Sequence, residues 1–405
     1  MANVSSSNGL EKRPKLRFPG FDEPYKQCRI GDIYAERSQR GASDMELLSV
    51  TMNDGVKPRS EIEGKDNSSE DKSNYKIVRK GDMVYNSMRM WQGANGISPC
   101  DGIVSPAYTV LMPKQEINNG YFAALFKSAN LINEFRKNSQ GMTSDTWNLK
   151  YPQIETIKVQ IPSVSEQDKV SEMFSVLDER IAAQSQLVES LKKYKRGLLR
   201  TVFSEKGSHS LLHDAVSHRI DEVCDVLSGK RIPKGETFSP RPTEYRYITV
   251  SDMGEKYISS DTLQFITSHT EKQITRYKVR NGDIIISVAG TLGKLNIITP
   301  DLDGVNLTEN CDRFTNFRGI NPEYLYHVLS SDLIQSQIEA SKTKNGQPKL
   351  ALERIRNFVV PVPHQIRQEQ FVGVMNSIDK YIASQQAVLD RCCKARAGLL
   401  QQLFI

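Results

Sequence analysis

The sequence lacks any apolar run that approaches the ~18 residues a membrane-spanning helix needs. Its first 15 residues contain no apolar segment of the kind found in secretory signals. Cysteine is sparse, with six in 405 residues, and none has the C-x-x-C spacing of a metal or redox site. Only Cys392 and Cys393 are close in sequence, which is typical of a reducing compartment rather than of a disulfide-bonded chain. We therefore expect a cytoplasmic protein that does not enter a membrane.

Motifs for catalysis and cofactor binding are also missing. AGTLGKL at residues 289–295 resembles a phosphate-binding loop, but it lacks the G-x-x-x-x-G-K-[ST] spacing and has no hydroxyl residue after Lys294. NPEY at residues 321–324 resembles the Asn-Pro-Pro-Tyr loop of adenine methyltransferases. Here Glu323 replaces the second proline, and no glycine-rich cofactor loop follows a strand.

The histidines His209 and His213 have the i, i+4 spacing of a zinc-binding helix, but Ser210 replaces the glutamate of H-E-x-x-H. A polar linker accounts for them more simply. No Ser-His-Asp or Cys-His arrangement has a local signature, and a triad assembled only in space would leave none. We therefore expect this chain to bind no metal and no cofactor, and to have a binding or scaffold role.

The chain does contain enough apolar sequence to fold, with 38% hydrophobic and 25% charged residues. Its formal net charge of +6 is compatible with a polyanion partner but does not demonstrate one. The most informative feature is an internal repeat with an offset of 201 residues. V-R-x-G-D at residues 78–82 returns at 279–283, and G-L-L at 197–199 returns at 398–400. The chain therefore consists of two copies of one unit.

Each copy ends in a segment that predicts a long helix, which begins after Pro162 in one copy and after Pro363 in the other. Apolar residues recur there at alternating steps of four and three, the pattern of a helix that packs along a heptad seam. The first seam is Val170, Phe174, Leu177, Ile181, Gln184, Val188, Leu191, Lys195, Leu198 and Val202. The second seam is Phe371, Met375, Ile378, Ile382, Gln385, Leu389, Cys392, Arg396, Leu399 and Leu403.

Polar residues interrupt both seams at the same places, Gln184 and Lys195 in one copy and Gln385 and Arg396 in the other. A helix that packs only on its own domain would explain one seam, whereas the matched breaks favour two helices that pack on each other. Two equivalent helices pair most simply as an antiparallel pair about a pseudo-twofold axis. We therefore predict that Gln184 and Gln385 meet near that axis and fix the register. At ~1.5 Å per residue, a helix of about 39 residues is roughly 58 Å long, the length of about 17 base pairs of DNA.

The segments before the helices contain strand-like runs such as DIIISVA at residues 283–289 and KVQIP at 158–162. The sequence thus predicts an α/β (α+β) fold with two mixed domains, joined by two long antiparallel coiled-coil helices in a pseudo-twofold repeat. The predicted boundaries are 1–162 for the first domain with its N-terminal tail, 163–206 for the first helix, 207–362 for the second domain and 363–405 for the second helix.

Several segments, taken in order, resemble the specificity subunit of type I restriction–modification systems. They are PKLRFPGF (14–21), KRGLLRTVF (195–203), GDIIIS (282–287), KNGQPKL (344–350), VPVPHQIRQEQF (360–371) and ARAGLLQQLF (395–404). Each is degenerate alone, but their order and duplication are specific, and the likeness covers nearly the whole chain. KNGQPKL has no clean counterpart in the first copy, where SQGMTSDTWNL (139–149) stands.

The resemblance implies two target-recognition domains, each of which reads one half of a bipartite site in double-stranded DNA. It also implies that the two helices set the spacing of the half-sites and dock two methyltransferase subunits, through which restriction subunits join. The chain would then be non-catalytic and would direct adenine-N6 methylation or restriction. S-adenosylmethionine, ATP and Mg²⁺ would be bound by the partner subunits.

Glycine-rich loops with cationic and amide side chains are the candidates for DNA contact, because such side chains bind phosphates and base edges. In the first domain the candidates are Arg89, Trp91, Gln92, Asn95, Thr143, Thr146 and Lys150. In the second domain they are Lys230, Arg231, Thr291, Lys294, Asn296, Lys344, Asn345, Gln347 and Lys349. For each of them, a solvated loop side chain is the alternative interpretation.

Two other functions stay open from the sequence. A coiled-coil scaffold without sequence-specific DNA binding predicts similar end domains. A stand-alone adenine methyltransferase needs a cofactor loop and an intact Asn-Pro-Pro-Tyr motif. The divergence of the two domains and the lack of both motifs favour the specificity subunit.

Overall fold

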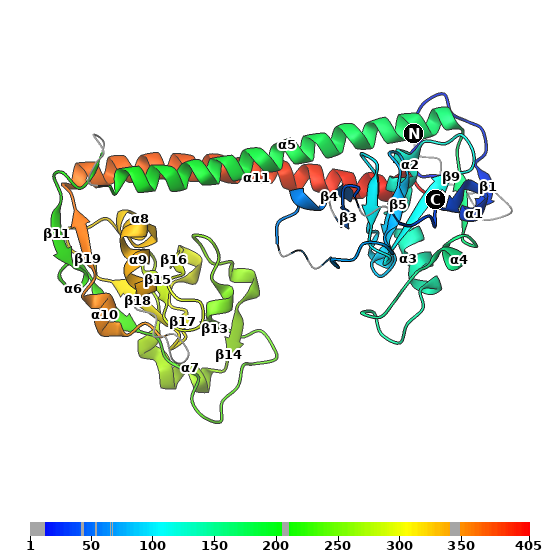
Figure 1. Cartoon of the computed structure of the whole chain (residues 1–405). Coiled ribbons are helices and arrows are strands. Elements are labelled where there is room, and N and C mark those ends of the chain that lie inside the picture. The colour runs from blue at the N-terminus through cyan, green and yellow to red at the C-terminus, as the bar shows by residue number, and fades with distance from the viewer. Residues whose placement is uncertain are drawn as a thin grey trace. The chain divides into compact units, whose positions relative to one another are not determined.

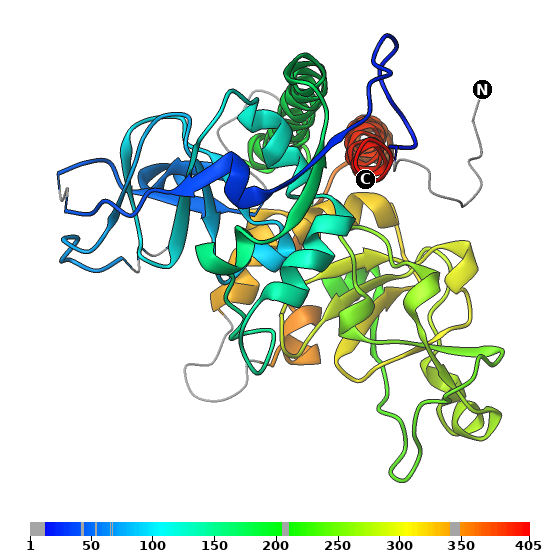
Figure 2. The same ribbon diagram turned by 90° about the vertical axis from the view of Figure 1, so that its right-hand side faces the viewer.

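The computed structural model describes residues 13–41, 44–52, 55–64, 66, 68–204, 210–340 and 349–405. The chain divides into two units (Figure 1). Unit 1 comprises Met1–Gln186 and Gln386–Ile405, and unit 2 comprises Leu187–Gln385. The long helices α5 (Val164–Val202) and α11 (Gln365–Gln402), which Figure 2 views nearly end-on, each contribute one part to unit 1 and the other to unit 2.

Unit 1 contains a four-stranded antiparallel sheet with the strand order β2-β9-β6-β7, and the two-stranded sheets β1-β10, β3-β4 and β5-β8. Its strands are β1 Lys26–Arg29, β2 Tyr34–Glu36, β3 Leu48–Thr51, β4 Gly55–Pro58, β5 Lys76–Val78, β6 Met83–Asn86, β7 Asn95–Ile97, β8 Gly102–Val104, β9 Tyr108–Pro113 and β10 Lys158–Ile161. Its shorter helices are α1 Ile30–Ile33, α2 Asn119–Leu125, α3 Ala129–Asn138 and α4 Tyr151–Ile154, with 3-10 turns at η1 Arg59–Glu61 and η2 Met90–Gln92.

Unit 2 contains the equivalent four-stranded sheet β12-β18-β15-β16 and the equivalent two-stranded sheet β11-β19. Its third sheet, β14-β13-β17, includes a parallel pairing of β13 with β17. The strands are β11 Val216–Arg219, β12 Asp225–Ser228, β13 Tyr245–Ile248, β14 Gln264–Ile266, β15 Ile284–Ser287, β16 Leu295–Ile297, β17 Asn306–Leu307, β18 Cys311–Thr315 and β19 Val359–Val362. The shorter helices are α6 Ile220–Val223, α7 Ser268–Ile274, α8 Pro322–Ser330, α9 Asp332–Ala340 and α10 Leu352–Arg356, with 3-10 turns η3 Val250–Asp252, η4 Ser260–Thr262, η5 Thr275–Tyr277 and η6 Pro300–Leu302.

The repeated V-R-x-G-D motif forms the same tight turn in both units, directly before a central strand. Gly81 and Gly282 adopt φ values of +90° and +83°, a left-handed conformation that glycine adopts without strain. The buried aspartates that follow, Asp82 and Asp283, each accept a hydrogen bond of 2.8 Å from the backbone N–H three residues earlier. The motif recurs because each turn needs the glycine for its backbone conformation and the aspartate as a hydrogen-bond acceptor for the N–H of the arginine.

A buried glutamine at the start of each long helix joins that helix to the sheet domain. The Nε2 of Gln167 donates to the carbonyl of Pro162, and its Oε1 accepts from the backbone N–H of Asn118, which caps α2. Gln368 makes the same two bonds in unit 2, where the capping residue of α8 is Asn321. We call this arrangement the glutamine clamp. Because the bonds are the same in both units, the clamp shows which residues of the two repeats are equivalent.

Aromatic residues link the helix pair to the sheet domain in each unit. In unit 1, Phe174 of α5 stacks on Phe404 with ring centroids 5.9 Å apart, and Phe404 lies 5.4 Å from Tyr121 of α2. In unit 2, Phe203 lies 5.6 Å from Phe371 of α11 and 6.1 Å from Tyr324 of α8. Every seam residue named above is buried or partly buried, whereas most other positions of α5 and α11 are exposed.

The two polar breaks near the helix ends form repeat-related ion pairs. In unit 1, Arg396 binds both carboxylate oxygens of Asp178. In unit 2, Lys195 binds Asp379, which Lys256 also approaches to 3.2 Å. In unit 1, Phe174 of α5 contacts Phe404, and Asp178, one turn later in α5, contacts Arg396, which comes earlier in the chain than Phe404. The two segments therefore run in opposite directions. The predicted antiparallel helix pair is therefore confirmed.

Gln184 belongs to unit 1 and Gln385 to unit 2, so their predicted meeting stays a prediction. The four domain boundaries also stay predictions, because the division into units passes through both long helices. No helix in the described part of the chain is long and apolar enough to cross a membrane.

Asp379 and Asp178 provide a matched pair for measuring what these ion pairs contribute. The side chain of Asp379 is 23% exposed and binds two lysines, whereas that of Asp178 is 49% exposed. Burial alone would raise the pKa of Asp379, but Lys195 and Lys256 outweigh burial and hold that pKa below its usual value. Removing the carboxylate of Asp379 should therefore destabilise unit 2 more than removing that of Asp178 destabilises unit 1.

We expect Asp379→Asn to lower the free energy of unfolding by about 2 kcal/mol, because two ammonium groups would then face each other in a half-buried site. Asp178→Asn should cost less than about 1 kcal/mol, because its ion pair is more exposed. Urea unfolding followed by far-UV circular dichroism measures both. Equal losses in the two variants would contradict the difference we assign to burial.

A buried histidine gives unit 2 a pH dependence with a defined sign. His327 of α8 is fully buried, and neither ring nitrogen has a hydrogen-bond partner among the described residues. Burial lowers the pKa of His327 to about 3, and the charges of Lys195 and Lys256 act in the same direction. The unfolded chain, in which a histidine has a pKa of about 6.5, therefore binds a proton that the folded unit does not. This contribution to stability is present above about pH 6.5 and is lost as the pH falls towards 3.

We expect the urea midpoint of unit 2 to fall between about pH 7 and pH 5, and His327→Phe to reduce that fall, because phenylalanine keeps the ring but takes no proton. Burial raises the pKa of Asp312 to about 6, so that group acts in the opposite sense. The comparison is therefore between the variant and the wild type at each pH. An identical pH profile for both proteins would show that His327 does not carry the effect.

Candidate nucleic-acid interface

In unit 2, one edge of the four-stranded sheet gathers most of the predicted loops. Strands β12 and β15 end at this edge, and β16 and β18 begin there, because neighbouring strands are antiparallel. The backbone N–H of Leu350 donates to the carbonyl of Val288 at 2.9 Å, and Lys349 forms a bridge with Ala289. Segments around residues 230, 290 and 349, far apart in sequence, are thereby brought to one edge.

The predicted side chains at this edge are mostly exposed. Lys230, Arg231, Thr291, Lys294 and Lys349 are all exposed to solvent. Arg231 is held by Glu309 at 2.7 Å, and the Nζ of Lys294 donates to the carbonyl of Met253 at 3.0 Å. Arg231 and Lys294 are therefore exposed cations whose positions are fixed by neighbours. Side chains of these types commonly contact phosphates. Lys344, Asn345 and Gln347 lie outside the described residues.

A buried carboxylate that the sequence did not single out lies behind these loops. Asp312, at the start of β18, is 2% exposed and stands opposite Ser228 at the end of β12. Burial raises the pKa of Asp312 to about 6, against the hydrogen bond with Ser228 and the positive charges of Lys349 and Arg356.

Unit 1 builds the equivalent edge with the same backbone connection. The N–H of Leu149 donates to the carbonyl of Ser87 at 2.8 Å, 201 residues before the bond between Leu350 and Val288. Arg89 and Gln92 are exposed in the loop after β6, and Trp91 is partly buried there. The connection brings in the predicted residues of the following loop, Thr143, Thr146 and Lys150, which are all exposed. The two threonines hydrogen bond to each other across a turn.

Two residues that were not predicted complete this edge. Trp147 lies 5.2 Å from Trp91, ring centroid to ring centroid, in an edge-to-face contact. The exposed guanidinium of Arg136 lies 5.6 Å from the ring of Trp91. The sequence contains only two tryptophans, and both are in this cluster. That scarcity is a signal from which Trp147 could have been chosen; nothing in the sequence distinguishes Arg136.

Asn95 and Asn296 differ from the other candidates because both are fully buried. They are 201 residues apart, and each Nδ2 donates to a backbone carbonyl, that of Gly93 in unit 1 and that of Gly254 in unit 2. A contact of either side chain with a base would require the surrounding strands to open.

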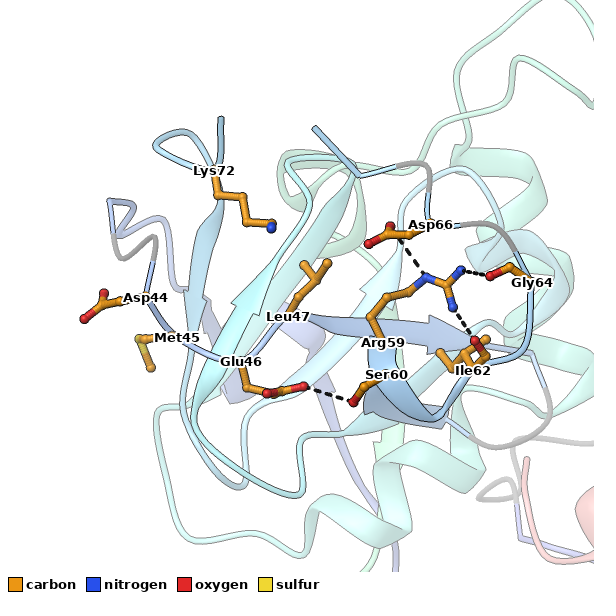
Figure 3. Close-up of a pocket in the computed structure, with 10 residues that line it drawn as sticks. All are labelled: Asp44, Met45, Glu46, Leu47, Arg59, Ser60, Ile62, Gly64, Asp66 and Lys72. Carbon is orange, nitrogen blue, oxygen red and sulfur yellow. Dashed lines mark hydrogen bonds and ion pairs between the residues drawn. The ribbon is translucent and has the colours of Figure 1, made fainter. Parts of the chain in front are cut away.

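A pocket elsewhere in unit 1 has no excess of positive charge among the lining residues that the structure describes. Figure 3 shows this pocket, of about 520 Å³, near β3 and η1. Its charged lining residues are Asp44, Glu46, Arg59, Asp66 and Lys72. Arg59 donates to two carbonyls of the following loop and lies 3.7 Å from Asp66 (Figure 3). Among the described lining residues, three carboxylates face two cations, which leaves no excess positive charge for a phosphate.

The arrangement defines a class of protein: two repeats, each with a basic loop edge on an antiparallel sheet, connected by a helix pair. Residues 23–193 and 213–391 each match the family described as the type I restriction modification DNA specificity domain. A relative of 23% identity over 346 residues is the type I restriction enzyme MjaVIII specificity subunit of Methanocaldococcus jannaschii; the match covers 81% of this chain and 79% of the relative.

Solved structures show the same fold. The type I restriction–modification S subunit from M. genitalium has a TM-score of 0.58 at 16% identity, with 97% of this chain and 99% of that chain covered. A chain from a study of complex assembly and conformational transition of a type I system has a TM-score of 0.60 at 15% identity, with 96% and 99% covered.

This chain belongs to the family of type I restriction modification DNA specificity domains and contains two copies of the domain. The family is one of recognition domains, not of enzymes. The resemblance inferred from the sequence, the mixed fold with its internal repeat, and the role of a DNA sequence-specificity subunit are therefore confirmed. Which residues contact DNA stays a prediction.

The fluorescence of Trp91 and Trp147 can report whether DNA binds at this edge of unit 1. We expect duplex DNA to quench the tryptophan fluorescence of the purified chain, because both tryptophans lie at the candidate edge. Arg136→Ala should weaken that binding several-fold, because the guanidinium beside Trp91 is exposed and positioned for phosphate or base contact. Lys169→Ala, which removes an exposed cation from α5, is the control. Fluorescence that does not respond to DNA, or equal effects of the two substitutions, would remove this edge as the contact surface.

Proposed function

We propose that each unit reads one half of a bipartite site in double-stranded DNA with the basic edge of its four-stranded sheet. The chain would bind two methyltransferase subunits, and restriction subunits would join through them in the cytoplasm. It would itself be non-catalytic, with S-adenosylmethionine, ATP and Mg²⁺ bound by those partners. The complex would methylate adenine N6 within the site, or cut DNA whose site is unmodified.

The observation that carries the proposal is that both units use the same backbone hydrogen bond to position loops whose side chains differ. Both edges are built on the same backbone bond, between Leu149 and Ser87 in unit 1 and between Leu350 and Val288 in unit 2. The side chains on this support differ, with Trp91 and Arg136 in unit 1 and lysines such as Lys349 in unit 2. The same backbone framework with different side chains suits the recognition of two different base sequences, because base edges are distinguished by the hydrogen-bonding groups that reach them.

The helix pair supports the proposed docking of partner proteins. On α11, Val374 and Tyr381 are seven residues apart, which places them on one face, and they are 53% and 51% exposed. On α5, Val176 and Tyr194 are 61% and 62% exposed. Exposed apolar and aromatic side chains on otherwise polar helices are typical of protein interfaces.

At the offset of 201 residues Ser377 stands in the place of Val176, and Arg180 stands in the place of Tyr381, so the exposed apolar residues of the two helices are not equivalent. The support for two copies of one partner is the presence of two copies of the domain.

The test is a genome-wide map of N6-methyladenine in the host, with and without this gene. We expect deletion to abolish methylation at one split motif, two short half-sites with a fixed spacer. We expect Arg89→Ala and Lys349→Ala each to relax one half-site, a different one in each variant, with a cost of ~1–3 kcal/mol if a base contact is lost. Uniform loss across sequences would instead assign those residues to phosphates. A map unchanged by deletion, in cells that express the gene, would overturn the proposal.

A further inference from the structure

Asn148 and Lys349 occupy equivalent positions at the candidate edges of the two units. Each stands directly before the leucine, Leu149 or Leu350, whose backbone N–H forms the repeated bond to the neighbouring strand end. The offset of 201 residues relates both pairs. The backbone therefore reaches the two edges by the same connection, and unit 1 has an amide side chain where unit 2 has an ammonium group.

Both side chains are directed away from the core. Leu149 and Leu350 are 0% and 1% exposed and belong to the cores of their units. Successive side chains of an extended backbone point in opposite directions, so the residues directly before these leucines face the loop surface. Lys349 is exposed and Asn148 is partly exposed, as this alternation requires.

The backbone that carries each side chain is also held by a neighbouring segment. The N–H of Asn148 donates to the carbonyl of Gln140 at 2.8 Å, and its carbonyl accepts from the N–H of Gln140 at 3.0 Å. Lys349 forms a β-bridge with Ala289. A fixed backbone leaves only the side-chain torsions to be ordered when a ligand binds, which lowers the entropic cost of a specific contact.

The fold does not use the amide of Asn148. Its Oδ1 is buried without a hydrogen-bond partner among the described residues, and no hydrogen bond joins its Nδ2 to any of them. A rotation of the side chain that brings the oxygen outward therefore breaks no bond, and a donor from outside would satisfy an oxygen that is costly to leave unpaired. Asn95 differs, because it is fully buried and its Nδ2 donates to the carbonyl of Gly93.

An amide and an ammonium group recognise different bases. The amide of asparagine offers one acceptor and a donor, which match N6 and N7 of adenine in the major groove. The ammonium group of lysine offers donors only, so it cannot accept from N6 of adenine and instead matches the acceptors O6 and N7 of guanine. The exchange of an amide for an ammonium group at one position therefore changes the preferred base.

We propose, on the basis of the function proposed above, that Asn148 and Lys349 are equivalent base-reading residues, one for each half-site. In unit 1 the Oδ1 of Asn148 accepts a hydrogen bond from N6 of an adenine, and its Nδ2 donates to N7. In unit 2 the Nζ of Lys349 donates to O6 and N7 of a guanine. The two half-sites thus differ at the base pair that this position reads.

The test exchanges the two residues and measures the sequence preference of the full chain, purified from its host with its bound partner subunits. A pool of DNA duplexes of random sequence is incubated with the protein, and the bound duplexes are sequenced. We expect the wild type to select a split motif with an adenine in one half-site and a guanine in the other. Asn148→Lys should replace that adenine by guanine, and Lys349→Asn should replace that guanine by adenine, each with a change of about fivefold or more in relative selection.

Lys80 and Asn281 supply the matched control. They are also 201 residues apart, both are exposed, and their backbone N–H groups make equivalent bonds of 2.8 Å to Asp101 and Asp303. They precede β6 and β15, so they lie at the opposite ends of these strands from the candidate edges. Lys80→Asn and Asn281→Lys exchange the same two side chain types and should leave both half-sites unchanged.

The outcomes separate this assignment from the proposed function. A split motif that Asn148→Lys and Lys349→Asn leave unchanged, or that the control variants change equally, overturns the assignment alone. Equal weakening across all sequences also overturns it, because it assigns both side chains to phosphates. If the folded wild type selects no split motif, the proposed function fails and the assignment fails with it. Thermal unfolding checks each variant, and Lys349→Asn, at an exposed position, decides alone if Asn148→Lys does not fold.

Discussion

The antiparallel packing of α5 against α11 is the interaction on which the rest of the structure depends. Neither helix has a purely polar surface, and an apolar seam of this length must be buried against a partner. In unit 1 the partner of the first part of α5 is the last part of the chain, where Leu403 and Phe404 are 3% and 5% exposed and pack in the core of the sheet domain. Unit 1 is thus complete only when the final residues of the sequence are in place, and its folding requires contacts between residues more than 200 apart.

The two units share the same framework of hydrogen bonds and turns, and they differ in the side chains of their loops. The glutamine clamp, the turn with Gly81 or Gly282, and the ion pair of a long-helix aspartate recur at fixed offsets. The glutamines of the clamp and the aspartates of the turns are buried and bonded to backbone, so a change in any of them would leave a polar group unsatisfied. Exposed loop side chains carry no such penalty. This separation allows the loops to differ between units while the folded framework stays the same.

The sequence predicted what depends on period and repetition. The 201-residue offset indicated two units, and the alternation of apolar residues indicated two long helices that pack in opposite directions, because both signals are local and redundant. The strand pairing was beyond reach: the parallel pairing of β13 with β17 joins segments about 60 residues apart and leaves no pattern in either. The burial of Asn95 and Asn296 was missed for a related reason. An asparagine in a glycine-rich run looks like a loop residue until the neighbouring strands cover it.

The contact between Trp147, Trp91 and Arg136 could not be predicted from the sequence either, because Trp91 is far along the chain from the other two residues. The three residues come from the segment after a turn, from η2 and from α3, and the backbone bond from Leu149 to Ser87 holds that segment beside the end of β6.

The ion pairs at the loop edges suggest how such a surface can be both ordered and available. Arg231 is 80% exposed yet held by Glu309. An exposed pair of this kind contributes only about 0–1 kcal/mol to stability, so a phosphate can replace the carboxylate at little cost. In the proposed complex with DNA, Arg231 would lose less side-chain entropy, because the carboxylate already limits the positions that its guanidinium samples. A buried pair such as Lys195 with Asp379 could not serve in this way, because separating it would leave a charge unsolvated. In unit 2 the two kinds of pair are separated: Lys195 with Asp379 is half-buried where the helices pack, and Arg231 with Glu309 is exposed at the loops. In unit 1 the pair of Arg396 with Asp178 is itself more exposed, so the burial of a helix ion pair is a feature of unit 2.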